Sequence, residues 1–440
     1  MVRTPVILLG AGLLVSALHP APGAGQEAGS EAPSDTLPAF TLRGVEVTVL
    51  RTPVAAVSAP RAVAVLGRPE LTRGKCGFFL HEALASMPGL QVQNRFNDAV
   101  GERLSVRGFG ARAQFGVRGI RILVDGIPAT LPDGQSTLDH LDLGSLGRVE
   151  LLRGSGADLY GNASGGVLKF QSRPPPAGLD LEAVGVAGSF GARRLQVSGA
   201  GRSGETGYLA SLSMHRFQGF RTDPSDPDGT YGASERLRLN ATLSTPLGGG
   251  VLAAVINAAG LDAENPGSLS DSLLALGERQ AYGFNVFQRT DKQVAQGQAG
   301  LTWTREGDRS RTELAGWFLR RDVDSRIPNT VIDLGRYAGG VRAARAGTLG
   351  NRRPLDITVG LEGQLQSDDR TTRENDGGEA GTLTLDQAER VATAAPFVGL
   401  EWSAAGNLLL SSALRYDFYR LEVDDRLVPP GGPDDSGSRT

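Results

Sequence analysis

The stretch of sequence that decides the fold is Leu355-Asp-Ile-Thr-Val-Gly-Leu-Glu-Gly-Gln-Leu-Gln366. Its apolar side chains alternate with polar ones, which is typical of a β-strand with one apolar and one polar face. Residues 236–244 repeat this alternation, with leucine or alanine at every second position and polar residues between them. The polar face is too uniformly hydrophilic for the interior of a soluble β-sandwich.

Similar segments of about ten residues recur from position 179 onward. We expect about eleven strands, near residues 179–187, 193–201, 206–217, 234–245, 251–261, 293–304, 311–321, 340–349, 354–366, 389–402 and 407–422. Short turns, such as 246–250 and 305–310, alternate with long polar loops at 217–233, 262–292, 322–339 and 366–387. A transmembrane β-barrel has this asymmetry, because its turns are short on one side of the membrane and long on the other. A soluble all-β domain is the alternative, and it gives no reason for every long loop to lie at one end.

The composition agrees with a β-rich, turn-rich protein. The chain has 440 residues with a net charge of -3 and 61 glycines, roughly twice the usual share of about 7%. Its single cysteine, Cys76, excludes an intramolecular disulfide, and the charge argues against nucleic acid as the main partner. Aromatic residues make up only 6%, so the aromatic girdles of a barrel would be thin. The sequence predicts no metal site, no cofactor and no enzyme motif.

Residues 1–25 are predicted to be a signal peptide for export. Arg3 precedes the apolar stretch Pro5–Leu18, and small residues follow it. A buried helix or an uncleaved anchor is the alternative. Residues 26–40 contain few apolar side chains, so we expect a flexible tail there.

Residues 41–173 are predicted to form a small α+β domain. We expect strands near 45–50, 62–66, 104–106, 120–124, 149–152 and 167–170, and a short helix over 79–86 that ends before Pro88-Gly89. Arg173-Pro-Pro-Pro176 is a stiff spacer, and residues 174–440 carry the barrel strands.

Four runs in this small domain are specific enough to indicate a family. They are Leu84-Ala-Ser-Met-Pro-Gly-Leu-Gln-Val92, Leu104-Ser-Val-Arg-Gly-Phe-Gly110, Ile122-Leu-Val-Asp-Gly-Ile-Pro128 and Arg148-Val-Glu-Leu-Leu-Arg-Gly-Ser-Gly-Ala-Asp-Leu-Tyr-Gly161. The domain resembles the plug of TonB-dependent outer-membrane receptors. The run Asp125–Gln135 is most similar to the ferric-dicitrate and siderophore branch, which also includes receptors for pyrroloquinoline quinone.

The resemblance implies an α+β plug followed by antiparallel transmembrane β-barrel strands. Receptors of this family close a barrel of about 22 strands around the plug, so the eleven strands are about half of it and the chain looks like an N-terminal portion. We expect the strand at 407–422 to have no partner downstream, because residues 427–440 resemble a loop. An open sheet edge is unfavourable in lipid, so the chain alone is not expected to insert as a closed pore.

The resemblance also implies three sets of functional residues. Val45, Glu46, Val47, Thr48 and Val49 occupy the position of the TonB box, although they are equally suited to be the first strand of the plug. Arg107 and Arg153 are expected to pair with Glu362 and Glu401 on the inner face of the barrel, unless they are solvated or paired within the plug. The ligand is expected at the plug apices, where the candidate residues are Asn94, Arg95, Asn97, Arg112, Gln114, Asp133 and Gln135.

The implied function is TonB-dependent uptake of a ferric siderophore or a ferric citrate-type chelate by a monomer in the bacterial outer membrane. Its expected partners are the TonB energy-transducing complex, membrane lipid and the ligand. One alternative is uptake of a non-iron small molecule such as a quinone cofactor. Others, of a different class, are a structural or adhesive surface barrel and a surface hydrolase. Gly199–Gly204 fits a dinucleotide-binding pattern, but a strand follows it, so we interpret it as a hairpin turn.

Overall fold

The computed structural model describes residues 46–49, 54–113, 116–276, 279–405, 408–428 and 436–439. The predicted signal peptide and tail lie outside the described residues, as do Val45 and Gln114. Residues 44–440 form one compact unit. No helix in the described part of the chain is long and apolar enough to span a membrane.

The N-terminal part of this unit, up to Ser172, is an α+β domain built on a five-stranded sheet. The strand order is β3 (Val63–Gly67), β10 (Leu146–Arg153), β11 (Gly166–Ser172), β7 (Ile120–Val124) and β8 (Ile127–Pro128), with β11 parallel to β7. Three two-stranded pairs join β1 (Glu46–Val47) to β2 (Val54–Ala55), β4 (Leu90–Gln93) to β5 (Arg103–Val106), and β6 (Val117–Arg118) to β9 (Gln135–Ser136). The helices are short: a 3-10 turn at Ala56–Ser58, then α1 (Arg68–Thr72), α2 (His81–Leu84) and α3 (Ala157–Tyr160).

A compact apolar core holds this domain together, and we call the domain the plug from here on. Ile120, Ile122, Leu151 and Phe170 are among its fully buried side chains, and all lie on the strands of the five-stranded sheet. The predicted strands near 62–66, 104–106, 120–124, 149–152 and 167–170 and the helix near 79–86 are confirmed to within a few residues. Of the strand predicted at 45–50, the described residues 46–49 contain the two-residue strand β1.

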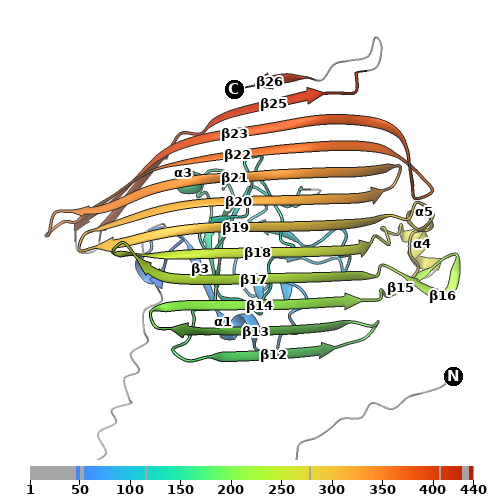
Figure 1. Cartoon of the computed structure of the whole chain (residues 1–440), viewed down its shortest axis with the longest axis horizontal. Coiled ribbons are helices and arrows are strands. Elements are labelled where there is room, and N and C mark those ends of the chain that lie inside the picture. Colours follow the sequence, from blue (N-terminus) through green and yellow to red (C-terminus); the bar gives the residue numbers. More distant parts are fainter. Residues whose placement is uncertain are drawn as a thin grey trace, which may run out of the picture. The chain divides into compact units, whose positions relative to one another are not determined.

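The rest of the unit, from Asp180 onward, is dominated by one antiparallel sheet of 13 strands (Figure 1). Its strands are β12 (Asp180–Ala187), β13 (Arg193–Ser203), β14 (Thr206–Phe217), β17 (Ser234–Leu247), β18 (Gly250–Glu264), β19 (Asp291–Gly307), β20 (Ser310–Ile327), β21 (Thr330–Leu349), β22 (Leu355–Asp376), β23 (Glu379–Ala405), β24 (Leu408–Arg415), β25 (Phe418–Asp425) and β26 (Gly437–Arg439). Each pairs with its neighbour along the chain, except that β24 and β25 both pair with β23. The fold is therefore a plug followed by a large antiparallel sheet, as predicted.

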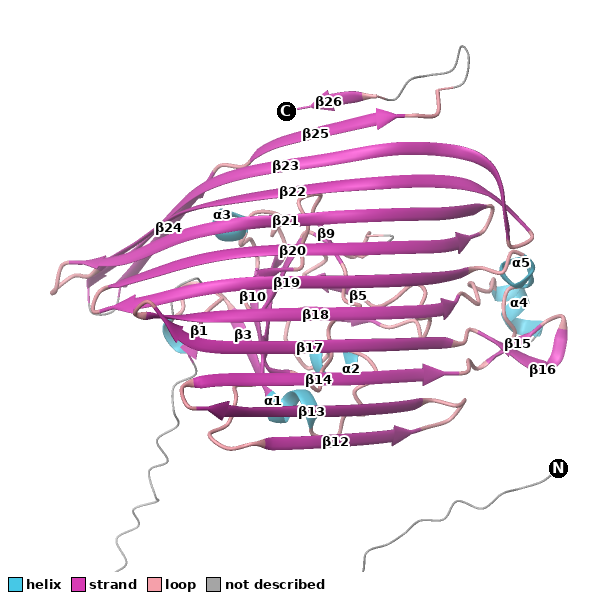
Figure 2. Cartoon of the chain, in the orientation of Figure 1, coloured by secondary structure: helices cyan, strands magenta, loops and turns pink. Residues whose placement is uncertain are grey.

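The two faces of this sheet follow the alternation in the sequence. Leu237, Leu361 and Leu365 are exposed on the outer face, whereas Gln296 and Gln364 are buried on the inner face, against the plug. We call the inner face the wall. Figure 2 shows the longer connections at one end of the sheet, where the hairpin of β15 (Arg221–Asp223) and β16 (Asp226–Tyr231) lies beside helices α4 (Asp271–Leu276) and α5 (Gly283–Phe287). We call this the loop-bearing end.

Two of the predicted long loops are wrong. Residues 322–339 continue strands β20 and β21, which turn at Pro328-Asn329, and residues 366–387 continue β22 and β23, which turn at Gly377-Gly378. These extensions carry polar residues on both faces, so they lack the alternation from which strands are predicted. Backbone pairing extends the hairpins, together with side-chain contacts such as those of Arg326 with Asp291 and of Asn375 with the carbonyl of Gln288.

The end of the sheet also differs from the prediction. The expected strand 407–422 is interrupted at Tyr416-Asp417, between β24 and β25, where Tyr416 donates its backbone N–H to the carbonyl of Pro396 at 3.1 Å. Pro396 has no N–H to return, so the regular ladder breaks opposite it. Downstream, β26 pairs with β25 through Leu421 and Arg439, so the strand does have a partner within residues 427–440.

Candidate functional site

At four places the wall supplies the positive partner and the plug the negative partner of an ion pair between them. Wall arginines contact plug aspartates, as Nη–Oδ pairs: Arg194–Asp142 at 3.2 Å, Arg321–Asp139 at 2.8 Å, Arg336–Asp133 at 3.5 Å, and Arg236–Asp98. The alternating strands aim these arginines inward, and the aspartates lie in plug loops that reach the wall. Because a guanidinium has several donors in a fixed plane, each can bind a carboxylate and a neighbouring amide or hydroxyl at once.

Asp139 and His140 lie at the centre of this interface. Arg321 donates to Asp139 Oδ2 and, at 2.6 Å, to Gln296 Oε1, while the amide nitrogen of Gln296 lies 3.1 Å from His140 Nδ1. Burial would raise the pKa of Asp139, but the nearby charges of Arg321 and Lys292 outweigh it and hold that pKa well below its usual range. Burial lowers the pKa of His140 to about 4, so this imidazole is neutral at physiological pH.

Two ion-pair clusters have the opposite polarity. In the first, Arg68 binds Glu182 and Arg173 binds Asp180 of β12 at 2.7 and 2.5 Å. The second is buried. Arg121 of plug strand β7 donates to Glu362 of β22 at 3.0 Å, and Arg342 and Arg415 of the wall approach the same carboxylate at 3.5 and 3.4 Å. The side chains of Arg121 and Glu362 are 1% and 0% exposed. Arg342 also binds Glu313 at 2.6 Å, so the cluster spans the four wall strands β20, β21, β22 and β24 and the plug sheet.

The predicted plug partners of the wall glutamates differ from those in the structure. Arg107 is exposed in a left-handed turn with a φ of 49°, and Arg153 packs on Gly89 and donates to the carbonyl of Val63 at 3.4 Å. The plug arginine that contacts Glu362 is Arg121, not Arg107 or Arg153. The hydrogen bond to Asp158 is the main cause that raises the pKa of Arg61, and the negative charge of Glu401 raises it further. The sequence does offer a clue to Arg121. A lone arginine inside the apolar strand Ile-Arg-Ile-Leu-Val needs a buried partner, which makes it a candidate for an ion pair.

The N-terminal segment 46–49 is held against the plug sheet. Glu46 and Val47 pair with Ala55 and Val54, and the backbone N–H groups of Thr48 and Val49 both donate to Glu150 Oε2 at 2.8 Å. Val47 and Val49 are fully buried. The hydroxyl of Thr48 accepts a 2.6 Å hydrogen bond from Lys169, whose pKa burial lowers although the charge of Glu150 opposes this. Glu150 had no role in the sequence prediction.

A cavity of about 380 Å³ lies between the plug and the wall near the loop-bearing end. Asp133 and Gln135, two of the predicted ligand residues, line it together with Lys292, Arg118 and Arg336. Arg336 joins the two sides, because it binds Asp368 at 2.5 Å and approaches Gln135 Oε1 at 3.4 Å.

The cavity is lined by both cations and carboxylates, and two of the cations make no ion pair among the residues that the structure describes. Within the described residues Lys292 makes no ion pair, and the hydrogen bond of Arg118 is to the carbonyl of Asp133, at 2.9 Å. These two side chains are therefore available to an anionic group.

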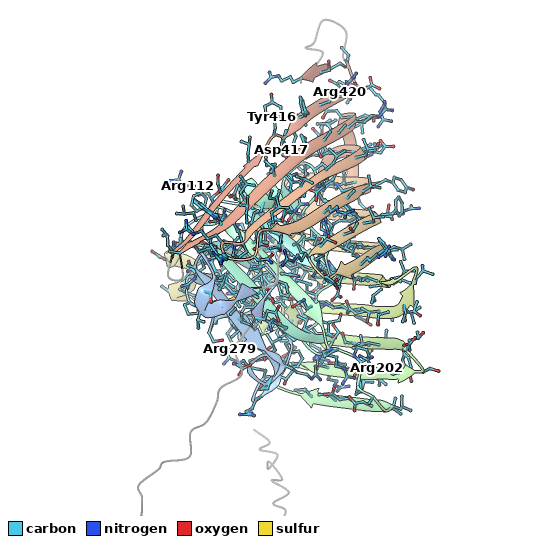
Figure 3. The ribbon with its side chains drawn as sticks, turned by 90° about the vertical axis from the view of Figure 1, so that its left-hand side faces the viewer. Arg112, Arg202, Arg279, Tyr416, Asp417 and Arg420 are labelled. Atoms are coloured by element: carbon cyan, nitrogen blue, oxygen red, sulfur yellow. The ribbon has the colours of Figure 1, made fainter. Side chains whose placement is uncertain are left out.

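The other predicted ligand residues lie around or outside this cavity. Asn97 donates to Asn265, a cavity residue, at 2.8 Å, and Asn94 contacts His81 Nδ1 at 3.0 Å. Arg95 and Arg112 are exposed at the surface of the plug. Figure 3 shows Arg112 well apart from Arg202 of β13.

Comparisons with known proteins agree with this architecture. Residues 55–167 match the family described as "TonB-dependent Receptor Plug Domain". The vitamin B12 transporter BtuB of Photobacterium profundum is 30% identical over 188 residues, which are 40% of this chain and 28% of that protein.

Solved structures share the fold at low sequence identity. The unliganded ferric citrate transporter FecA superposes with a TM-score of 0.72 at 16% identity, over 87% of this chain and 59% of that one. The ferric yersiniabactin uptake receptor FyuA from Yersinia pestis gives 0.70 at 17%, over 87% of this chain and 61% of that one. The chain thus spans about three fifths of these structures and 28% of the curated relative. It carries a TonB-dependent receptor plug domain, followed by strands with the fold of the barrels of these receptors.

Proposed function

Starting from this plug domain and its barrel strands, we propose that the chain belongs to an outer-membrane receptor for energised uptake of a scarce small ligand. The ligand binds in the cavity near the loop-bearing end, and a TonB complex in the inner membrane pulls residues 45–49. The observation that carries the proposal is that the cavity and the N-terminal segment lie toward opposite ends of the sheet. Segment β1 lies toward the end of the sheet opposite α4 and α5 (Figure 2), so a ligand and a pulling partner would act on opposite ends of one plug.

The proposal includes a release step for the N-terminal segment. An extended segment can add as a strand to a partner's sheet only if its backbone N–H and C=O groups are free. Here Glu46 and Val47 are paired with β2, and the N–H groups of Thr48 and Val49 are bound to Glu150. The segment therefore leaves Glu150 before a partner engages it.

We assign the chain as a signal peptide at 1–25, a tail at 26–40, the plug at 41–173 and barrel strands from 174 to 440. The receptor acts as a monomer in the bacterial outer membrane, without a cofactor and without enzymatic activity. The plug–wall contacts are polar pairs that water can replace, which suits a plug that must move under force.

The favoured ligand is a ferric siderophore or a ferric citrate-type chelate. Lys292 and Arg118 line the cavity without a close ion pair among the described residues, and cations suit the anionic groups of such chelates. The similarity to a vitamin B12 transporter supports a non-iron ligand as a second candidate. Growth of a receptor-deletion strain carrying this gene, on defined iron sources or on limiting vitamin B12, distinguishes the two.

Deletion of residues 45–49 tests the transport mechanism. We expect ligand binding to whole cells to survive and energised uptake to stop. Unchanged uptake would overturn the assignment of this segment. If no ligand accumulates even with the native receptor, a surface barrel that binds macromolecules without transport is favoured instead.

Changing Arg95 and Arg112 together to Ala tests the proposed apical contacts. A loss of binding beyond about tenfold supports them, and unchanged affinity removes them from the site.

A further inference from the structure

The cavity of about 380 Å³ near the loop-bearing end, which we call the larger cavity, has aliphatic side chains along one side. They are Val323 and Ile327 of β20 and Ile332 and Leu334 of β21. Val323 pairs with Leu334 and Ser325 pairs with Ile332, so all four lie on one face of a single hairpin. Each is partly exposed, so apolar surface is open to the cavity. We call these four residues the aliphatic strip.

The aliphatic strip lies on the face of the sheet that is polar elsewhere. Farther down β20 the outward positions are apolar, as at Leu314 and Phe318, which are both exposed. At the tip of the hairpin the outward positions hold Asp322, Asp324 and Asp333, and the aliphatic side chains point inward. Aliphatic surface gains free energy only when it is removed from water. Its place on the inner face therefore points to an apolar partner inside the cavity.

The plug covers only part of the aliphatic strip. Lower on the same strand, the inward Leu319 is buried against Leu131 of the plug. Val323 packs against the cluster that contains Val294 and a plug alanine. The other three residues of the strip belong to none of the buried apolar clusters in the described part of the chain. They are therefore the part of the strip that a ligand can cover.

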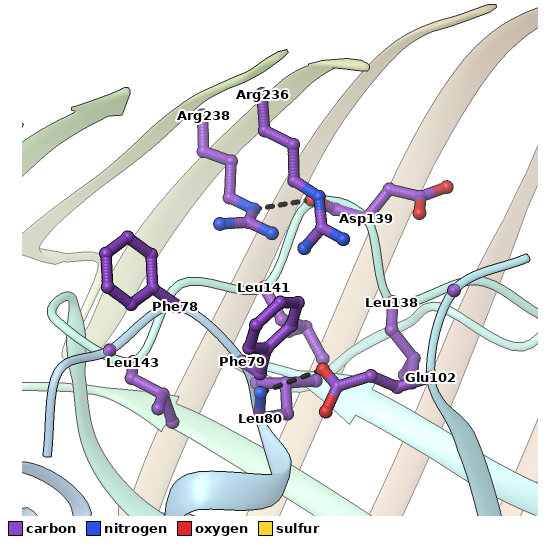
Figure 4. A pocket seen from close by; sticks show the side chains of 12 residues that line it. Phe78, Phe79, Leu80, Glu102, Leu138, Asp139, Leu141, Leu143, Arg236 and Arg238 are labelled. Atoms are coloured by element: carbon purple, nitrogen blue, oxygen red, sulfur yellow. Dashed lines mark hydrogen bonds between the residues drawn. The ribbon is translucent and has the colours of Figure 1, made fainter. Parts of the chain in front are cut away.

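The charges that line the larger cavity nearly balance, so it does not call for a highly charged ligand. Its carboxylates have partners, which are Arg321 for Asp139, Arg336 for Asp133 and Asp368, Arg326 for Asp291, Arg370 for Glu389, and the backbone N–H groups of Leu80 and His81 for Glu102. Figure 4 shows the bond from Leu80 to Glu102, which with Leu138 and Asp139 also lines a smaller cavity of about 20 Å³. A polyanion in the larger cavity would meet these carboxylates as well as the cations.

One of the two cations without a close ion pair stands beside the aliphatic strip. Lys292 precedes Val294 by two positions on β19, and Val294 pairs with Val323 of the strip. Side chains two positions apart on a strand lie on the same face, so the ammonium of Lys292 is a near neighbour of the strip within the cavity lining. A single anionic group bound there would place the rest of its molecule against the aliphatic side chains.

We propose that the ligand carries an alkyl or aryl body next to a single anionic group, an inference that rests on the proposed uptake function. The body covers the aliphatic strip, and the anionic group binds Lys292 or Arg118. The proposal narrows the ligand class named above. A chelate with apolar substituents fits this lining, whereas ferric dicitrate, which has several carboxylates and no apolar body, does not.

Two uncharged ferric chelates with the same iron-binding atoms test the role of the strip. Ferric tris(acetohydroxamate) carries methyl groups, and ferric tris(benzohydroxamate) carries phenyl rings. We expect the purified receptor in detergent to bind the phenyl complex at least about tenfold more tightly. Leu334→Asn should remove most of this preference. Leu276→Asn, at a leucine of α4 that is 82% exposed and outside the cavity lining, should retain it. Equal affinities for the two complexes, or an unchanged preference in Leu334→Asn, would overturn the proposal.

A second measurement needs neither a variant nor an iron complex. Crystals of the unmodified receptor soaked in 4-iodobenzoate should show an anomalous iodine peak against Ile332 and Leu334. The carboxylate should lie within hydrogen-bonding distance of Lys292 or Arg118. Iodine bound only elsewhere, or at no site, would overturn the proposal even if neither hydroxamate complex binds.

The two measurements separate this inference from the proposed function. A receptor that prefers the phenyl complex but accumulates no ligand would contradict the proposed transport alone. Energised uptake that stops on deletion of residues 45–49, together with equal affinities for the two complexes, would contradict this inference alone.

Discussion

Arg121, in the middle of the buried plug strand β7, donates a 3.0 Å hydrogen bond to Glu362 of wall strand β22, 241 positions later in the chain. Both side chains are almost completely removed from solvent. Arg342 and Arg415 approach the same carboxylate, so one glutamate holds three buried cations at the junction of plug and wall. This contact fixes the plug sheet to the wall, and the charges of Arg342 and Glu313 also act on Lys169, which donates to Thr48 of the N-terminal segment.

Replacing Glu362 by Gln should destabilise the receptor, because Arg121, Arg342 and Arg415 stay buried without that charge. Removing one partner of a buried ion pair typically costs about 3–5 kcal/mol, so we expect a clear fall in the thermal unfolding midpoint in detergent. Glu379→Gln is the matched control, because this glutamate is 81% exposed and pairs with Arg289 at 3.3 Å on a hairpin. Equal losses in the two variants would contradict a structural role for the buried cluster.

Stability should also fall at mildly acidic pH because of His140. Its pKa is lowered by burial to about 4 in the folded state, against 6.5 for an exposed histidine. The folded state therefore resists protonation, and stability present above pH 6.5 is lost as the pH falls toward 4. The full loss is on the order of 3 kcal/mol.

The difference between the native receptor and His140→Asn isolates this contribution from the carboxylates that titrate in the same range. We expect the two to diverge in their pH dependence between about pH 6.5 and 4. Parallel stability curves for the two proteins over that interval would show that His140 is not the group responsible.

The sequence predicted the alternating part of the sheet well, because the two faces there have different surroundings. Where one face is exposed and apolar and the other packs against the plug, apolar and polar residues alternate, as in Leu355–Gln366. In Asp322–Ile327 and Ser367–Asp376 both faces carry polar residues, and inward ones such as Asp368 are buried in hydrogen bonds, so these strands carry no alternation. Those extensions were predicted as loops for that reason.

Partners across the plug–wall contact could not be predicted in the same way. The polar face of β17 shows that Arg236 and Arg238 point inward, but not which plug loop they meet. That depends on where Asp98 and Asp139 lie in three dimensions, and neither residue has a local pattern that marks it. The prediction therefore placed arginine on the plug and glutamate on the wall, whereas the Asp139–Arg321 pair and three others have the reverse arrangement.

Glu150→Ala should loosen the N-terminal segment. The N–H groups of Thr48 and Val49 would lose their acceptor, and each such loss costs about 1–3 kcal/mol. We expect amide hydrogen exchange at Thr48 and Val49 to accelerate by about tenfold or more. Glu205→Ala, at an exposed position in the turn between β13 and β14, is the control and should leave this exchange unchanged. Protection that persists in Glu150→Ala would mean that pairing with β2 alone holds the segment.

Lys292→Met should weaken binding of an anionic chelate. The ammonium of Lys292 lines the larger cavity without an ion pair among the described residues, so its charge is available to the ligand. A charge-assisted hydrogen bond in a partly enclosed site contributes roughly 1.5–3 kcal/mol. We therefore expect a loss of affinity of about tenfold or more, measured as the dissociation constant of the purified receptor.

Arg289→Met is the control, because it removes a positive charge from the same end of the sheet. Its side chain is 69% exposed and lies outside the cavity lining. A similar loss in both variants would indicate long-range attraction, and would remove Lys292 from direct contact. A neutral ligand that binds both variants and the native receptor equally would point instead to the second candidate, a non-iron substrate.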